Sequence, residues 1–139
     1  MSAVRFLDTN VLLYAYDLDA PAKRAVALKV VEEGWIRPGS AAVSVQVLQE
    51  FHVNLTRKGL SREEASKVAE SYLAWPVVEN TAVLFRNGCE VQARWQLSLW
   101  DAMILAAAQA AGAKELWSED LNPGQKYGSV RVVNPFVDF

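Results

Sequence analysis

The sequence is poor in cysteine and histidine and has no long hydrophobic run. Its one cysteine, Cys89, cannot form an internal disulfide and supplies no cysteine cluster for zinc. With His52 as the one histidine, the sequence shows no obvious Ser–His or Cys–His catalytic pair. No apolar segment approaches the roughly 20 residues that span a bilayer, and no signal peptide is recognisable. These absences predict a cytoplasmic protein with a reduced thiol and no membrane association.

Length and composition indicate one folded domain, which we expect to span residues 1–139. The chain has 52% hydrophobic and 22% charged residues, and it contains no repeat, linker or low-complexity tract. Its net charge of -2 argues against a protein that holds nucleic acid mainly by bulk charge. A nuclease is still compatible with this charge, because carboxylates that hold cations lower the net charge while basic residues elsewhere meet phosphates.

Short apolar segments alternate with segments of helical periodicity. Strands are predicted at residues 4–7, 41–44, 77–78, 115–118 and 130–133, and helices at residues 11–16, 21–33, 61–75, 81–94 and 98–111, with a further helix that ends at Gly59. Gly34 is expected to end the second helix, and Ser61 with Glu64 to form a capping box. This alternation predicts an α/β domain with a largely parallel sheet.

Two of the predicted helices carry apolar stripes that should face the core. Helix 61–75 is expected to bury Ala65, Val68, Ala69, Tyr72 and Leu73, and helix 98–111 to bury Trp100, Met103, Ile104, Ala107 and Ala111. Helix 98–111 is the clearest prediction of the set. The dipeptide Asn87-Gly88 is unfavourable for the helix predicted at residues 81–94, because Asn-Gly is typical of turns.

Four carboxylates fall where the predicted sheet would present a binding site. Asp8 and Asp120 come directly after apolar strands, and ligands of open α/β sheets bind beyond the carboxyl ends of strands. Asp101 lies in the first turn of its helix, near the positive end of the helix dipole. Glu50 and Asp101 both lie at the border of a buried helix face, from which a side chain can reach a cleft.

Convergence of these carboxylates would create a site for a hard divalent cation. Without a cation the four charges would repel one another, and some would be pushed toward protonation. Mg²⁺ and Mn²⁺ prefer oxygen ligands, and such a metal activates water and neutralises charge that develops on a phosphodiester. Spacing alone does not show convergence.

Each carboxylate also has an ordinary structural interpretation. Asp8 is compatible with a turn after a strand, and Glu50 with a solvated helix charge. Asp101 is compatible with a capping box that it completes with Ser98. Asp120 is compatible with simple loop chemistry before the turn at residues 122–124. The residues alone leave both interpretations open.

Five segments, read in order, resemble a known family. They are FLDTNVLLY at residues 6–14, VLQEF at 47–51, SLWDAMI at 98–104, LWSEDL at 116–121 followed by Gly124-Gln125, and VRVVNPF at 130–136. Together they resemble PIN domains, especially the VapC-type toxins of prokaryotic toxin–antitoxin pairs, over nearly the whole chain. The resemblance implies a three-layer α/β/α fold with a central, mainly parallel sheet. It also implies an endoribonuclease that depends on Mg²⁺ or Mn²⁺ and hydrolyses RNA phosphodiesters.

The resemblance also implies which residues hold the metal. Asp8, Glu50 and Asp101 match the core acids of the family, and Asp120 matches a more variable fourth acid. Glu119 is a neighbour that can substitute or assist, but consecutive residues on an extended segment point to opposite sides, so we favour Asp120.

Polar residues beside the acids, and partners, follow from the same resemblance. Asn10, Ser98 and Ser118 match supporting positions that orient a carboxylate or a bound water, although Ser98 is equally well explained as a plain helix cap. VapC-type proteins form homodimers and bind a small antitoxin protein over the active-site region. Both partners are therefore expected here, together with an RNA substrate.

Several further residues admit a functional and a structural interpretation. His52 lies on a different helix face from Glu50, so we expect it to pack against neighbours or to lie at the solvent boundary, and not to bind metal or act as a general base. Trp100 and Trp117 flank proposed acids and suit base stacking, but core packing is favoured for both. Basic side chains that suit RNA phosphates, or are merely solvated, are Arg5, Lys23, Arg24, Arg57, Lys58, Arg62 and Lys126.

Two other functions are compatible with an acidic α/β site. One is a catalytically inactive PIN-like module that binds RNA or protein. The other is a phosphatase or a receiver domain, which needs a nucleophilic or phosphate-accepting Asp beside a Lys. Asp8 is followed by Thr9 and Asn10 instead of a second acid, and no lysine follows a late strand at a suitable place. The nuclease is therefore the favoured hypothesis.

Overall fold

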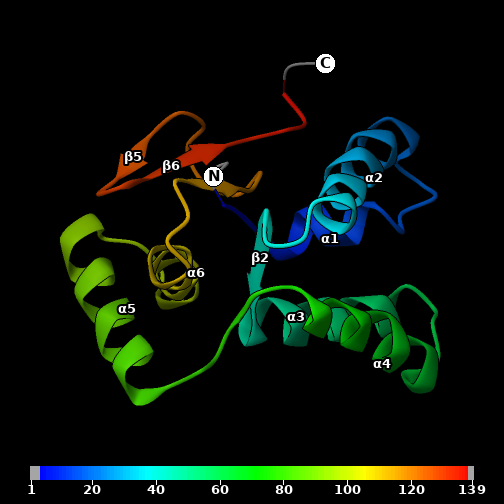
Figure 1. Ribbon diagram of the computed structural model, residues 1–139, viewed down its shortest axis with the longest axis horizontal. Helices are drawn as coiled ribbons and strands as arrows, with labels where there is room; N and C mark the ends of the chain where they lie inside the picture. The colour runs from blue at the N-terminus through cyan, green and yellow to red at the C-terminus, as the bar shows by residue number, and fades with distance from the viewer. Residues whose placement is uncertain (1–3, 138–139) are drawn as a thin grey trace.

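The computed structural model describes residues 4–137, which form a six-stranded sheet with helices on both sides (Figure 1). The strand order is β3-β2-β1-β4-β6-β5. The strands are β1 (Arg5–Leu7), β2 (Ala41–Ser44), β3 (Val77–Val78), β4 (Glu115–Trp117), β5 (Lys126–Tyr127) and β6 (Val130–Val133). All neighbouring strands pair in parallel except β5 and β6, which form an antiparallel hairpin. The expected α/β/α fold class with a mainly parallel sheet is confirmed.

The helices fill the connections between parallel strands. They are α1 (Thr9–Tyr14), α2 (Pro21–Ile36), α3 (Val45–Arg57), α4 (Arg62–Ser71), the 3₁₀ helix η1 (Tyr72–Ala74), α5 (Ala82–Trp95) and α6 (Leu99–Ala110). Helix α1 packs on α2 and α3, whereas α6 packs on α5 and on strands β2, β4 and β6. Figure 1 shows α1 and α2 on one side of β2, and α5 and α6 on the other.

The central strands are buried, as expected for a sheet covered on both faces. Phe6 and Leu7 of β1 and Val43 of β2 have no exposed surface. Their burial anchors the two strands in the core. Helices α1 and α3 begin within two residues of the ends of these strands, so their first turns are anchored as well. No helix among residues 4–137 is long and apolar enough to cross a membrane.

Most predicted elements are confirmed, including β2, β3, β6 and the capping box of Ser61 and Glu64. The predicted end of α2 at Gly34 is wrong, because the helix continues to Ile36. Gly34 serves close packing instead: a Cβ there would lie 2.6 Å from Cζ2 of Trp75. The Asn87-Gly88 pair lies inside α5, which continues through it. Gly88 also serves close packing, since a Cβ there would collide with Sδ of Met103 on α6.

Two residues that the apolar stripes placed in the core are exposed. Leu73 is 58% exposed because α4 ends at Ser71 and the chain tightens into η1, which breaks the helical period. Trp100 is 67% exposed, and the core packing favoured for it is wrong. Burial of α6 begins at Ala102 and then covers most of the helix, so one stripe does not describe its buried surface.

Candidate active site

Three predicted acidic positions meet at one edge of the sheet. Asp8 follows β1, Asp120 follows β4, and Glu50 lies on α3, which follows β2. Strand β1 pairs in parallel with both β2 and β4, so the carboxyl ends of these strands share an edge. Because the chain order reverses at β1, this edge is the topological switch point at which α/β proteins bind ligands.

Asp8 is the buried member of the group, with 7% of its surface exposed. It caps α1: its Oδ1 accepts a 2.7 Å hydrogen bond from the backbone N–H of Thr9. Its Oδ2 accepts a 2.8 Å hydrogen bond from the hydroxyl of Ser118. Burial raises the pKa of Asp8 to about 7, and the charges of Asp120 and Glu50 add to this, against the opposing effect of the two hydrogen bonds.

The side chain of Thr9 connects Asp8 to Glu50. While its backbone N–H binds Asp8, its hydroxyl Oγ1 donates a 2.6 Å hydrogen bond to Oε1 of Glu50. The two acids are therefore linked through one residue in the first turn of α1. Thr9 was not assigned a role from the sequence, although its place between Asp8 and Asn10 in the first motif is a usable signal.

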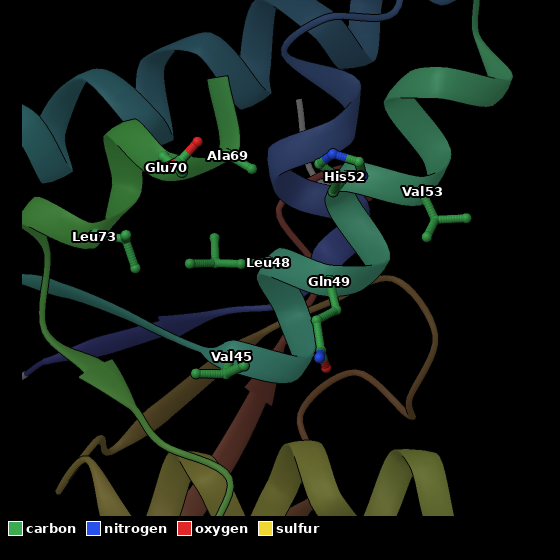
Figure 2. Close-up of a pocket in the computed structure, with 8 residues that line it drawn as sticks. All are labelled: Val45, Leu48, Gln49, His52, Val53, Ala69, Glu70 and Leu73. Atoms are coloured by element: carbon green, nitrogen blue, oxygen red, sulfur yellow. The ribbon is translucent and has the colours of Figure 1, made fainter. Parts of the chain in front are cut away.

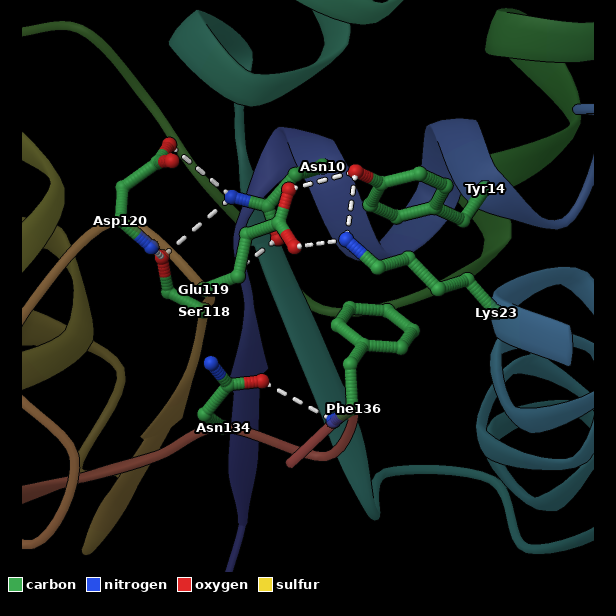
Figure 3. A network of polar contacts seen from close by, with 8 residues as sticks. All are labelled: Asn10, Tyr14, Lys23, Ser118, Glu119, Asp120, Asn134 and Phe136. Atoms are coloured by element: carbon green, nitrogen blue, oxygen red, sulfur yellow. Dashed lines mark hydrogen bonds and ion pairs between the residues drawn. The ribbon is translucent and has the colours of Figure 1, made fainter. Parts of the chain in front are cut away.

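Ser118 connects Asp8 to the segment that carries Asp120. The Ser118 side chain is fully buried, and its Oγ accepts hydrogen bonds from the backbone N–H of Asp120 at 3.1 Å and from Nδ2 of Asn10 at 3.4 Å. Nδ2 of Asn10 also donates to Oδ2 of Asp120 at 3.0 Å. Figure 3 shows the side-chain nitrogen of Asn10 facing both Ser118 and Asp120. Asn10 and Ser118 thus contact the acids beside which they were predicted to lie.

Asp101 is the most separate of the four predicted ligands. Its side chain is half-buried, and it has no hydrogen bond or ion pair with the other three acids in the part of the chain that the structure describes. The Oγ of Ser98 accepts a 3.1 Å hydrogen bond from the backbone N–H of Asp101, so Ser98 acts as an ordinary helix cap. Nε2 of Gln46 binds the carbonyl of Trp100 at 3.3 Å and ties the start of α6 to α3. The role of Asp101 in metal binding stays a prediction.

Glu119 turns away from these acids. Its carboxylate accepts a 2.6 Å hydrogen bond from the hydroxyl of Tyr14 and forms a 2.9 Å ion pair with Lys23. The side chains of Glu119 and Asp120 therefore diverge, as predicted, although the two residues lie in a bend after β4 and not in an extended segment. Tyr14 and Lys23 were not predicted as partners of Glu119, because nothing in their spacing shows that α1 and α2 would reach this segment.

A crevice of about 540 Å³ opens beside Asp120 and Glu50. Its lining residues are Thr9, Asn10, Leu13, Gln49, Glu50, Val53, Asn54, Arg57 and Asp120. Arg57 is the one cation of this lining, and among residues 4–137 it has no ion-pair partner. The crevice therefore contains one positive group together with the acids Glu50 and Asp120, and Arg57 lies on the same helix as Glu50.

Several other candidate residues have partners of their own. Arg5 pairs with Glu33 at 2.9 Å and lies 4.3 Å over the half-buried ring of Trp117. Lys58 pairs with Asp17 at 3.2 Å. Nε2 of His52 lies 3.1 Å from Oγ of Ser66, on the side of α3 that faces α4.

The donor set suits a hard divalent cation. In residues 4–137, none of the four predicted acids has an ion pair with Lys or Arg, so their negative charge has no counter-ion there. The described residues contain no group of three or more acidic, His or Cys side chains close enough to form a ready metal cage. Mg²⁺ usually needs no such cage, because it keeps several waters and binds one or two carboxylates together with substrate phosphates.

Comparisons with known proteins bear on the fold and the family of the chain. No curated protein matches the chain. A solved toxin–antitoxin complex from Klebsiella pneumoniae matches with 24% identity and a TM-score of 0.67, over 96% of this chain and 98% of that one. VapC20 of Mycobacterium tuberculosis, a toxin that cleaves the sarcin–ricin loop, matches with 20% identity and a TM-score of 0.63, over 81% of this chain and 86% of that one.

A third structure is VapBC2 of Rickettsia felis bound to a DNA fragment from its promoter. It matches with 18% identity and a TM-score of 0.65, over 93% of this chain and 96% of that one. At these identities the likeness establishes the fold, which is that of VapC-type proteins. The PIN domain family model matches residues 5–126, most of the chain. The chain belongs to the PIN domain family.

Proposed function

We propose that this protein is an endoribonuclease that depends on Mg²⁺ or Mn²⁺ and acts as the toxin of a prokaryotic toxin–antitoxin pair. The observation that carries the proposal is the pair of hydrogen-bonded bridges, through Thr9 and Ser118, at the switch point. Thr9 joins Asp8 to Glu50, and Ser118 joins Asp8 to the Asp120 segment. Carboxylates from three distant parts of the chain are thereby linked, and two of them, Glu50 and Asp120, line the crevice. None of the three forms an ion pair with Lys or Arg among residues 4–137.

In this proposal Asp8, Glu50, Asp101 and Asp120 hold the metal, and Asn10, Thr9 and Ser118 orient their carboxylates. When bound, a divalent cation lowers the pKa of water and neutralises charge on the phosphodiester. The buried carboxylate of Asp8 gains most from a cation, since burial and neighbouring negative charges disfavour its ionised form. The hydrogen bonds from Thr9 and Ser118 fix which Asp8 oxygen faces which neighbour.

The RNA backbone would enter the crevice beside Arg57. A guanidinium without an ion-pair partner suits a phosphate next to the scissile one, because it presents a planar fork to two phosphate oxygens. The chain carries a net charge of -2, so RNA must be held by local contacts rather than by the overall field. Arg57 is the residue of the crevice that supplies such a contact.

An apolar groove on α3 is proposed as the binding surface for the antitoxin. The groove, of about 500 Å³, lies between α3 and the segment α4–η1 (Figure 2). Leu73 and Val53 on its walls are 58% and 45% exposed. Gln49 and Val53 line both the groove and the acidic crevice, so a partner seated in the groove reaches the active site. The toxin–antitoxin complexes among the similar structures support a protein partner of this kind.

The expected homodimer stays a prediction. Exposed apolar side chains such as Leu18 and Ile36, at 78% and 67% exposure, are compatible with a second protein surface. Light scattering of the purified chain at high concentration tests it, and a strict monomer would contradict it.

The direct test of the nuclease is the Asp101→Asn variant. We expect this variant to lose RNA cleavage with Mg²⁺ or Mn²⁺ while its circular dichroism and melting temperature stay close to those of the wild type, because Asp101 is half-buried and bonded through its backbone alone. The exposed Glu90 on α5 provides a control, Glu90→Gln, with full activity. Cleavage by Asp101→Asn at the wild-type rate would show that the proposed mechanism is wrong.

The alternative is a catalytically inactive PIN-like module that binds RNA or a protein. The observation that favours it is the position of Asp101, which among residues 4–137 has no hydrogen bond or ion pair that links it to the other three acids. Titration calorimetry of the wild-type protein with Mn²⁺ separates the two functions. An active nuclease binds Mn²⁺ and requires it for cleavage, whereas an inactive module binds RNA without such a requirement.

A further inference from the structure

Glu119 has partners that the other acids of this region lack. The hydroxyl of Tyr14 donates to its Oε1 at 2.6 Å, and Nζ of Lys23 donates to its Oε2 at 2.9 Å (Figure 3). Nζ of Lys23 also lies 3.2 Å from the hydroxyl of Tyr14. The three side chains form a closed triangle that joins α1, α2 and the segment after β4.

Lys23 is built into this triangle and is not a freely solvated charge. Its Nζ lies 4.7 Å from the centre of the Tyr14 ring and 5.8 Å from that of Phe136. The two rings meet edge to face with their centres 4.9 Å apart, and the side chain of Asn134 accepts the backbone N–H of Phe136 at 2.9 Å. The aromatic surface and the two oxygen partners together fix where the ammonium group lies.

The triangle acts on the segment that also carries Asp120. The backbone N–H of Glu119 donates to Oδ1 of Asn10 at 3.3 Å, and Nδ2 of Asn10 donates to Oδ2 of Asp120 at 3.0 Å. One side of the segment is thus held by Asn10, and the other side by Lys23 and Tyr14. A shift of Glu119 would move the backbone of Asp120, because the two residues are adjacent.

We propose that Lys23 and Tyr14 are positioning residues of the active site: Lys23 neutralises Glu119, and both hold its carboxylate away from the metal, so that Asp120 alone of the two adjacent acids faces it. This inference rests on the proposed metal-dependent nuclease. Without Lys23, the Glu119 carboxylate has no counter-ion, and a divalent cation nearby becomes its best partner. Competition between the two acids then distorts the metal site.

The rival role for Lys23 is direct contact with an RNA phosphate, and a double-mutant cycle separates the two roles. The variants are Lys23→Met, Glu119→Gln and their combination, with Lys23→Arg as the conservative replacement. Lys67→Met, on an exposed position of α4, is the matched control. Mn²⁺ affinity is measured by calorimetry without RNA, and kcat and KM are measured separately with an RNA substrate.

If the positioning role is correct, Lys23→Met lowers kcat about tenfold while KM changes less than twofold. Mn²⁺ binding becomes several-fold tighter, because the freed Glu119 carboxylate binds the cation in a non-productive arrangement. Lys23→Arg keeps most of the wild-type kcat, and Lys67→Met leaves kcat and Mn²⁺ affinity unchanged. In the Glu119→Gln background, Lys23→Met has no further effect, because Lys23 acts through the Glu119 carboxylate. Circular dichroism confirms that each variant is folded.

Two results would overturn the inference alone. One is an unchanged Mn²⁺ affinity in Lys23→Met. The other is a rise in KM caused by Lys23→Met that is the same with Glu119 and in the Glu119→Gln background, which indicates a direct phosphate contact. Both leave the nuclease intact, since the wild-type protein still binds Mn²⁺ and cleaves RNA. A wild-type protein that neither binds Mn²⁺ nor cleaves RNA would overturn the inference together with the proposed function.

Discussion

The hydroxyl of Ser118 donates a 2.8 Å hydrogen bond to Oδ2 of Asp8, across 110 residues of sequence and in a fully buried position. This bond joins the carboxyl ends of the adjacent parallel strands β1 and β4. The same oxygen of Ser118 accepts the backbone N–H of Asp120. One small side chain therefore determines how two of the proposed metal ligands lie relative to each other.

Replacing this hydroxyl should weaken both the fold and the metal site. In Ser118→Ala, Oδ2 of Asp8 loses its donor and the N–H of Asp120 loses its acceptor, which we expect to cost about 1–3 kcal/mol in the free energy of unfolding. Mn²⁺ affinity should fall about tenfold. Urea unfolding and calorimetry measure the two effects.

The control for Ser118→Ala is a helix cap far from the acids. The hydroxyl of Thr81 accepts the backbone N–H of Leu84 at 3.0 Å at the start of α5. Thr81→Ala should cost about 1 kcal/mol of stability and leave Mn²⁺ affinity unchanged. Equal Mn²⁺ affinities for the wild type and Ser118→Ala would contradict the role given to Ser118.

The raised pKa of Asp8 predicts a stability that falls with pH in metal-free protein. Asp8 binds its proton up to about pH 7 in the folded state, against an ordinary value of 3.8. Between these values the unfolded chain loses its proton first, so the free energy of unfolding decreases as pH rises and then levels off above pH 7. The decrease should be a few kcal/mol, at about 1.4 kcal/mol for each unit of pKa difference.

Asp8→Asn tests the origin of this pH dependence. With EDTA present, the variant should lose the decrease between pH 4 and 7 and be more stable than the wild type at pH 8. Mn²⁺ should raise the melting temperature of the wild type at pH 8, because it offsets the unpaired charge, and should leave Asp8→Asn nearly unchanged. Parallel pH profiles for the two proteins would show that Asp8 is ionised without penalty.

Arg57→Gln should weaken RNA binding without altering the chemistry. We expect KM for RNA to rise several-fold and kcat to stay within twofold, since Arg57 lines the crevice but forms no ion pair with the acids among residues 4–137. Removal of one phosphate contact should also reduce the salt dependence of RNA binding by about one unit in the log–log slope. Arg62→Gln, at the exposed start of α4, is the control, and an identical effect there would argue against a specific contact.

Leu73→Glu should abolish antitoxin binding and leave RNA cleavage intact. Leu73 is 58% exposed on the wall of the apolar groove, so a charge there disfavours an apolar partner more than it disfavours folding. Val83→Glu on α5, where the valine is 62% exposed, is the matched control. The readout is affinity for the purified product of the neighbouring reading frame. Unchanged affinity in Leu73→Glu would place the partner elsewhere.

The fold was largely predictable because its strands are short apolar runs bounded by helix signals. Ala41–Ser44 and Val130–Val133 are recognisable from local sequence, and Ser61 with Glu64 marks a helix start directly. Asp8 and Asp120 could also be predicted as site residues, because each follows an apolar strand and α/β sheets bind ligands beyond the ends of their strands.

Tertiary contacts explain what the sequence did not show. Gly34 and Gly88 suggested helix ends or breaks, but each permits close packing against a residue distant in sequence, Trp75 and Met103. The pairing of Lys23 with Glu119 spans 96 residues and joins two elements whose approach no local pattern specifies. Thr9 is intermediate: its position in the first motif was visible, but its bond to Glu50 depends on the packing of α1 against α3.

The most direct test of the central claim is the anomalous X-ray signal of manganese in crystals grown with Mn²⁺. The acids are proposed to meet around one cation, so we predict a strong peak within coordination distance of Asp8 and of at least one other carboxylate among Glu50, Asp101 and Asp120. Well-ordered manganese only at other surfaces, or no peak at a Mn²⁺ concentration that supports RNA cleavage, would contradict the account.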